Sequence, residues 1–282
     1  MGIIGHAVGD TPWAAWSLDA PAIVLTLLGA LLFAQGFLRL RARRAALAPW
    51  SRAGLFGAGL ALSCLAIVSP IDHVGEEYLQ WAHMLQHVLI ADVGPALMLI
   101  AVRGPLALFV IPRAVLGPLA RFKPLQSALR TLLRPAVSVT LWVAALVIWH
   151  VPAFYESALT DRGAHAAMHF SFVAVGLLVW TQIVDPGAKA RLTVSQRLGV
   201  VALVFWVGQI LAYVIAFTPE PLFDPYVDQP TRLFGLSPLT DQKLAAVVMI
   251  VEQMATLGTA FWLLYRAKAR DDAQVAETPV WR

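Results

Sequence analysis

Long apolar segments recur along the chain, separated by clusters of glycine, proline or charged residues. An apolar segment of about 17 to 25 residues is long enough to cross a bilayer as a helix. The pattern therefore predicts an all-α, polytopic membrane protein with seven transmembrane helices. The segments lie at residues 20–38, 53–70, 82–102, 136–152, 164–184, 198–217 and 243–265.

Composition supports a membrane protein rather than a soluble domain. Of 282 residues, 59% are hydrophobic and only 13% are charged, and the mean hydropathy is +0.70. Soluble domains carry about 25% charged residues. The formal net charge of +4 is too small to indicate a nucleic-acid partner, so the lipid bilayer is the expected environment. Cys64 is the only cysteine, which excludes an internal disulfide and a CxxC metal motif.

The distribution of positive charge predicts the orientation. When seven helices are threaded alternately, 18 of the 21 Lys and Arg residues fall on one side. The other side carries Arg162, Arg232 and Lys243 together with eleven acidic residues. Because short cytoplasmic loops are enriched in Lys and Arg, we expect the N-terminus outside and the C-terminus in the cytoplasm. Residues 1–19 then form an outer arm, 20–265 the transmembrane domain and 266–282 a loosely ordered cytoplasmic tail. No basic region precedes the first apolar run, so we expect no cleavable signal peptide.

All seven histidines fall on or near the predicted outer face. His83 and His87 lie at the head of the third helix, and His165 and His169 open the fifth. Residues four apart share one face of a helix, so each pair places two imidazoles side by side. His150 ends the fourth helix on the same side. The five imidazoles could surround one ion or hold two.

This donor set favours copper. Imidazole suits copper, zinc, iron and nickel, whereas a thioether selects Cu(I). Thioethers stand near both pairs, so the candidate metal ligands are His83, His87, His150, His165, His169, Met84 and Met168.

Each candidate ligand also has a structural interpretation. A histidine near the interface can bond loop backbone, and a methionine in an apolar helix usually fills the core. For the four paired histidines we favour metal binding, because burying four imidazoles in a membrane needs a reason. For His150 the two interpretations are equal. Backbone bonding is favoured for His6 and His73, although Asp72 could still help an entry site.

Two carboxyl groups, Asp92 and Glu252, lie about 15 Å inside their helices. An ionisable group at that depth is a functional hypothesis by default. They could relay protons or cations beneath the metal site, or be protonated groups that bond backbone or a glutamine such as Gln209 and hold helices together. Five residues beyond His87, Asp92 is expected to be turned about 140° away from it.

Several motifs resemble a known family. HMLQH at 83–87, WHVPAFYESAL, HAAMHFSF, the Asp185-Pro186 step and SPLTDQKLAAVVM are similar to motifs of the CtaG-type cytochrome c oxidase assembly factors. These are multi-helix bacterial plasma-membrane proteins implicated in building haem–copper oxidases. The resemblance covers residues 78–250 and implies a cytochrome c oxidase subunit as partner and copper as cargo. It highlights His83, Met84, His87, His150, His165, His169, Asp185, Asp241 and Gln242.

We therefore expect a copper-binding metallochaperone with no turnover chemistry, which hands copper to a nascent oxidase from an outer-face site. Both a monomer and a homo-oligomer are compatible with the sequence. A copper transporter is the alternative, motivated by Asp92, Glu252 and Met98. A haem protein with histidine axial ligands fits less well, because such ligands usually face each other across helices.

Overall fold

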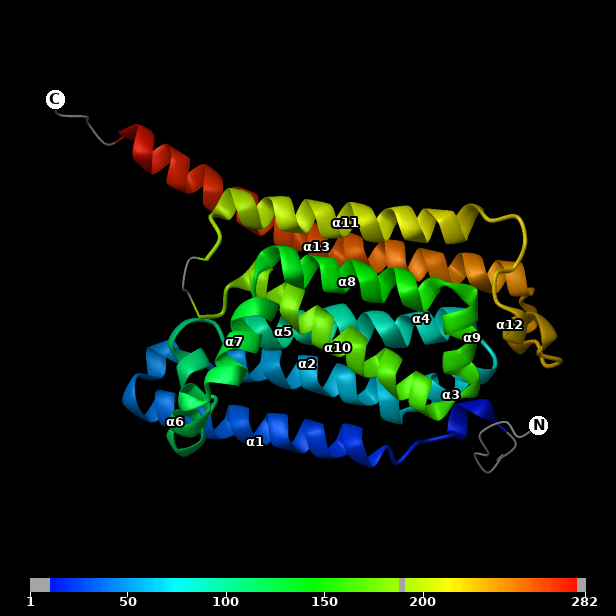
Figure 1. Cartoon of the computed structure of the whole chain (residues 1–282), viewed down its shortest axis with the longest axis horizontal. Coiled ribbons are helices and arrows are strands. Elements are labelled where there is room, and N and C mark those ends of the chain that lie inside the picture. The colour runs from blue at the N-terminus through cyan, green and yellow to red at the C-terminus, as the bar shows by residue number, and fades with distance from the viewer. Residues whose placement is uncertain (1–10, 188–190, 278–282) are drawn as a thin grey trace.

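Helices account for 84% of the chain in the computed structural model, which describes residues 11–187 and 191–277 and contains no strand among them. The longest helices run side by side along one direction (Figure 1). Residues 1–10 of the expected N-terminal arm, His6 included, and residues 278–282 of the expected tail lie outside the described residues.

Each predicted apolar segment forms a helix or part of one. The segments correspond to α1 (Ala20–Arg43), α2 (Trp50–Val68), α4 to α5 (Gln80–Val88 and Gly94–Ala101), α8 (Pro135–His150), α10 (Arg162–Val184), α11 (Val194–Phe217) and α13 (Pro238–Glu277). Between α4 and α5 the chain makes a π-helical turn, η3 (Leu89–Val93), and the two helices continue through it as one candidate span.

Six described helices or helix pairs are long and apolar enough to cross a membrane. The bent pair of α7 (Lys123–Leu132) and α8 makes a seventh if it is counted as one span. The prediction of an all-α membrane protein is confirmed, whereas the count of seven and the sidedness of the termini stay predictions.

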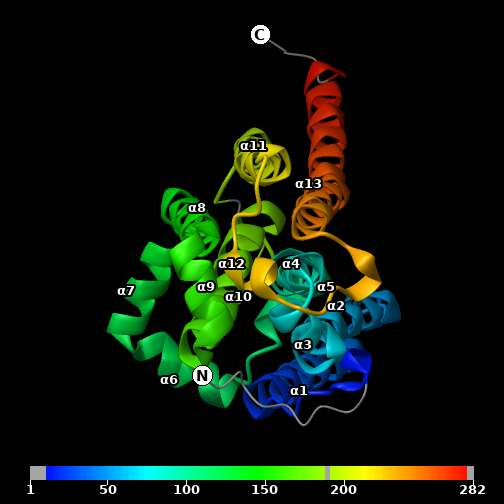
Figure 2. The same cartoon turned by 90° about the vertical axis from the view of Figure 1, so that its right-hand side faces the viewer.

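Burial separates two central spans from the rest. The α4–α5 span is 61% buried and α10 is 56% buried, against 17–33% for the other candidate spans. Seen end-on, α4, α5 and α10 lie between α1 and α2 on one side and α8, α11 and α13 on the other (Figure 2). The outer helices instead expose large apolar side chains, such as Leu31 of α1 and Ile210 of α11. Apolar surface facing outward around a partly polar interior is the arrangement that lipid favours.

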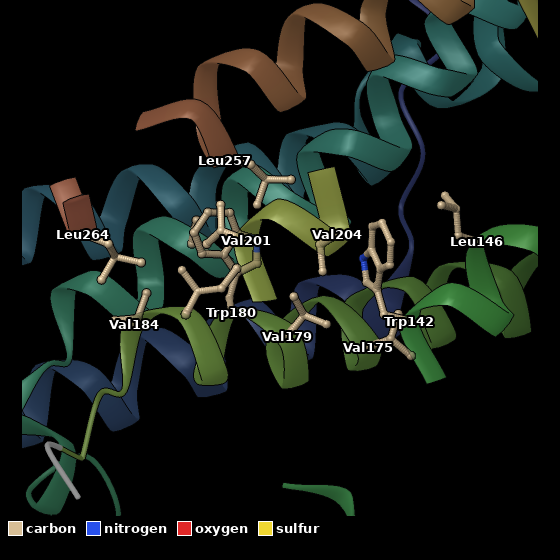
Figure 3. Packing of buried hydrophobic residues seen from close by; sticks show 12 residues of the cluster. Trp142, Leu146, Val175, Val179, Trp180, Val184, Val201, Val204, Leu257 and Leu264 are labelled. Atoms are coloured by element: carbon tan, nitrogen blue, oxygen red, sulfur yellow. The ribbon is translucent and has the colours of Figure 1, made fainter. Parts of the chain in front are cut away.

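One apolar core holds the central helices to the outer ones (Figure 3). Two tryptophans anchor it, Trp142 of α8 and Trp180 of α10, both almost fully buried. The side chains packed around them come from α8, α10, α11 and α13 and include Leu146, Val175, Val179, Val184, Val201, Val204, Leu257 and Leu264.

Short helices cover the two ends of the bundle. At one end lie α3 (Pro70–Glu77), α9 (Pro152–Thr160) and α12 (Asp224–Asp228), and at the other α6 (Arg113–Arg121) and α7 (Figure 1). We call the first end the α3 end. Residues 103–135, which lie between two of the predicted apolar segments, are thus largely helical. Its helices expose Leu116, Leu119 and Leu129 beside basic residues, which is typical of helices lying in a membrane interface.

The helix α13 continues past Tyr265 to Glu277. The expectation of loose order after Tyr265 is therefore wrong for residues 266–277. The segment is rich in Ala, Arg, Lys and Gln, which are strong helix formers. An ion pair one turn apart, Lys268 Nζ to Asp272 Oδ2 at 2.7 Å, supports the same helix.

Candidate metal centre

Four imidazole rings meet where α4 crosses α10, near the α3 end. Within each helix the ring centroids are 4.2 Å apart for His83 and His87, and 4.1 Å apart for His165 and His169. Between the helices they are 5.8 Å apart for His83 and His165, and 5.5 Å apart for His87 and His169. The two pairs expected from the i,i+4 spacing therefore come together in one cluster, which we call the imidazole cluster.

Three members of the imidazole cluster have converging donor atoms. One ring nitrogen each from His83, His165 and His169 lies within 4.8 Å of the other two. Nitrogens bound to one ion at about 2.0–2.1 Å would be about 3–4 Å apart, so small side-chain rotations would bring the three onto one ion. Nε2 of His83 and Nε2 of His169 are buried and have no hydrogen-bond partner among the described residues. Such atoms usually have a partner in folded proteins, so these fit a metal.

Two tyrosines hold the His83 ring from its other nitrogen. His83 Nδ1 lies 2.9 Å from the Tyr155 hydroxyl and 3.1 Å from the Tyr226 hydroxyl. The Tyr226 hydroxyl donates a hydrogen bond to the Gly75 carbonyl oxygen at 2.7 Å. The Tyr226 oxygen can therefore accept a hydrogen bond from His83 Nδ1–H. Burial raises the pKa of both phenols, which keeps them protonated. The arrangement leaves the Nε2 lone pair of His83 available, as in histidines that bind metals.

His165 faces carboxylates as well as imidazoles. Its Nε2 lies 2.9 Å from Glu76 Oε1 and 4.0 Å from Asp72 Oδ1, while Nδ1 is 3.2 Å from the Ala158 carbonyl. Asp72, Glu76 and His165 form a second group whose donor atoms lie within 4.8 Å of one another. The same imidazole thus belongs to a nitrogen-rich group and to an oxygen-rich group nearer the surface.

Burial changes the pKa of Asp72, one member of this second group. Burial, and after it the neighbouring Glu76 carboxylate, raises the pKa of Asp72 to about 7. Gln86 of α4 donates to Asp72 Oδ1 and, at 3.0 Å, to the Ala66 carbonyl. The sequence indicates Asp72 only as an aid to ion entry and does not single out Glu76, although Glu76 lies one helical turn after Asp72 and the spacing is that of a pair.

His150 lies apart from the three converging donors. Its Nδ1 is 2.7 Å from the Leu146 carbonyl, so Nδ1 carries the proton and Nε2 carries the lone pair. That Nε2 is buried and unbonded within residues 11–187 and 191–277. His150 and His87 line the same small cavity. The five predicted imidazoles are therefore divided between two neighbouring places.

The two candidate methionines are both buried, but in different surroundings. Met168 packs among apolar side chains that include Ala158 and Phe172, which is the core-filling arrangement. Met84 packs against α11 and α13 and also lines the cavity beside His87.

The expected rotation of Asp92 away from His87 is wrong. The π turn Leu89–Val93 contains Asp92, and a π turn advances less than 100° per residue because it has more residues per turn. Asp92 consequently lines the same cavity as His87. Its Oδ1 accepts a hydrogen bond from Trp180 Nε1 at 2.7 Å.

Within the described residues, the side chain of Glu252 bonds a threonine of its own helix and not a glutamine. Its Oε1 accepts from Thr256 Oγ1 at 2.8 Å, and Gln209 instead donates to Gln253 at 3.2 Å. Glu252 lines the same cavity as Asp92.

The remaining residues highlighted by the family resemblance have structural roles. Asp241 accepts hydrogen bonds from the backbone N–H groups of Gln80 and Trp81, at 2.7 and 3.0 Å, and so caps α4 from another helix. Gln242 accepts from the Leu222 N–H at 2.7 Å. Asp185 ends α10 in a left-handed conformation, with φ 48°.

These features define a polytopic helical membrane protein with a buried imidazole cluster on its two central spans. The family model for the cytochrome c oxidase caa3 assembly factor (Caa3_CtaG) matches residues 31–270, and the chain belongs to this family. The match includes every residue of the imidazole cluster and confirms the resemblance seen in the sequence. The family is one of assembly factors, not a class of catalytic enzymes. No curated protein and no solved structure matches the chain.

Proposed function

We propose that this assembly factor binds copper at His83, His165 and His169 and transfers it to cytochrome c oxidase as the oxidase is built. The observation that carries the proposal is the convergence of three imidazole donors from two helices, two of them with a buried nitrogen that no described residue bonds. Leaving such groups unpaired in a membrane protein is unfavourable, and a bound ion would satisfy them.

The chemistry of the donors supports copper and a transfer role. Imidazole binds copper well, and the chain has one cysteine, so a thiolate zinc site is not available. His165 stands between the imidazoles and the Asp72–Glu76 carboxylates. A copper ion could exchange one ligand at a time through His165, which a tightly closed site would not allow.

We place the centre on the outer side of a bacterial plasma membrane. The support is the charge asymmetry, since the loops at the end opposite the α3 end carry most of the Lys and Arg residues. The partner would then receive copper on that outer side.

Copper titration of the purified protein tests the proposal. Anaerobic Cu(I) titration against a chromophoric chelator should show that His83→Ala and His169→Ala each lose one equivalent relative to the wild type. His73→Gln is the matched control, because His73 is a buried histidine of α3 outside the imidazole cluster. In cells lacking the factor, the two alanine variants should fail to restore oxidase activity while the control restores it. Unchanged copper binding together with full oxidase activity in both variants would contradict the proposal.

Transport of copper across the membrane is a second candidate. One observation favours it, namely that the Asp92 and Glu252 carboxyls line a cavity next to His87 inside the bundle. Copper flux into proteoliposomes that Glu252→Ala abolishes would favour transport, and the absence of flux would remove it.

The volume of the cavity beside His87 and His150 disfavours a haem function. The cavity beside His87 and His150 measures about 40 Å³, whereas pockets for organic ligands measure about 300–1,000 Å³. An absorbance scan of the purified protein should therefore show no Soret band.

A further inference from the structure

A small cavity lies deeper in the bundle than the three converging imidazoles. Its volume is about 40 Å³, which exceeds the roughly 10–15 Å³ needed to hold one water or a small ion. Side chains from α4, η3, α8 and α13 bring donor atoms to it. These donors are Met84, His87, Asp92, His150, Met249 and Glu252.

Several polar atoms of the lining residues have no partner. Both ring nitrogens of His87, Nε2 of His150 and Oε2 of Glu252 are buried without a hydrogen bond in the described part of the chain. The opposite atoms of two of these groups are held, His150 Nδ1 by the Leu146 carbonyl and Glu252 Oε1 by Thr256. In metal sites, the atom that binds the ion is free while the other polar atom of the same side chain is hydrogen-bonded to the protein.

The charge of the cavity favours a cation. Two carboxyl groups, Asp92 and Glu252, line it, and none of the described lining residues is a lysine or an arginine. Burying two carboxylates without a counter-charge is unfavourable, and a metal ion would supply that charge. The imidazoles of His87 and His150, with the thioethers of Met84 and Met249 in the same lining, select a soft transition metal rather than magnesium or calcium.

We propose that this cavity is a second copper site, separate from the outer one and next to it. His87 connects the two, because its ring is 4.2 Å from that of His83 and also lines the cavity. The inference rests on the proposed copper-handling function and extends it. The chain would hold one ion at His83, His165 and His169 and a second ion in this cavity.

Metal stoichiometry tests this inference. The wild-type protein in detergent is titrated with Cu(I) alone, beside an inner double variant, His150→Ala with Glu252→Gln, and an outer one, His165→Ala with His169→Ala. We expect two equivalents in the wild type and one in each double variant. Circular dichroism checks that each variant remains helical.

A milder substitution guards against misfolding of the inner double variant. Met249→Leu keeps the volume of the side chain and removes only the thioether. It should weaken the inner equivalent about tenfold or more and reduce sulfur scattering in the X-ray absorption spectrum of that ion, leaving only the contribution of Met84. Met254→Leu is the matched control, because Met254 is on the same helix but 60% exposed.

The outcomes separate this inference from the proposed function. Two equivalents retained by the inner double variant and unweakened in Met249→Leu would overturn the inner site. A single wild-type equivalent lost only in the outer variant would also overturn it, while leaving the proposed function intact. A single equivalent lost only in the inner variant would support the cavity and overturn the outer centre. No copper binding by the wild type would overturn both.

Discussion

The imidazole rings of His83 and His165 face each other across the contact between α4 and α10, with centroids 5.8 Å apart and planes 12° from parallel. The contact is long-range, because the two helices are far apart in the chain. The contact depends on how closely α10 approaches the π turn and on how α4 begins, and both can be changed by single substitutions.

Gly176 of α10 sets the approach to the π turn. A Cβ at this position would lie 1.9 Å from the Ala91 carbonyl oxygen, so Gly176→Ala must push the helices apart. We expect a loss of about 1–3 kcal/mol in stability, as in other overpacked cores, and weaker copper binding. Thermal unfolding in detergent and copper titration measure the two effects.

Gly199 of α11 is the matched control, because a Cβ there meets nothing within 4 Å. Gly199→Ala should stabilise the protein by about 0.5–1 kcal/mol, the usual gain in a helix. An equal gain from Gly176→Ala would show that the helices do not meet as described.

Tyr226 orients the ligand His83. In Tyr226→Phe the Gly75 carbonyl loses its donor, and His83 Nδ1 keeps only the Tyr155 hydroxyl. We expect copper affinity at the outer site to fall about 10- to 100-fold, as when other partners of metal-binding histidines are removed. Chelator competition measures it. Tyr213→Phe, on an exposed side chain of α11, should leave affinity unchanged, and equal affinities in both variants would refute the orienting role.

Asp241 holds the start of α4. In Asp241→Ala the N–H groups of Gln80 and Trp81 lose their acceptors, so we expect a loss of about 0.5–2 kcal/mol, the usual range for a helix cap. Asp241→Asn keeps one acceptor oxygen and should lose less. Thermal unfolding provides the measurement, with the exposed Asp228→Ala as control. A melting temperature of Asp241→Ala equal to that of the control would exclude the capping role.

The stability of the metal-free protein should depend on Asp72 between pH 4 and 7. Burial, and after it the Glu76 carboxylate, raises the pKa of Asp72 from 3.8 to about 7, while His165 and the hydrogen bond from Gln86 lower it. A folded-state pKa above the unfolded one means that the contribution to stability is full below about pH 4 and is lost as the pH rises through about 7. Melting temperatures at pH 5 and 8 should therefore differ less in Asp72→Asn than in the wild type. The same pH dependence in both proteins would contradict this.

Much of the fold follows from the apolar pattern. Seven apolar segments predict the long helices within a few residues, because a span needs a fixed length of apolar chain. The pattern does not predict α6 and α7, whose short amphipathic helices lie in a stretch of mixed residues. It also ends α13 too early, because the charged segment after Tyr265 is helical by propensity and not by hydrophobicity.

The imidazole cluster was predictable only in part. Spacing alone places His83 beside His87 and His165 beside His169. It does not give the partners of those rings, since Glu76 and Tyr226 reach them from the short helices α3 and α12, which the apolar pattern does not predict. Nor does spacing separate His150 from His165, because depth in the membrane is shared by residues on opposite sides of a bundle.

The π turn at Leu89–Val93 gives the central span one residue more than a regular α-helix would use for the same turn. If the same residues wound as a regular α-helix, the first half of the span would be rotated by about 100° against its second half. His83 and His87 would then turn away from α10 while the second half kept its packing. Two relatives with identical histidines could therefore differ in whether the rings meet, and the difference would lie in how this one turn winds and not in any ligand.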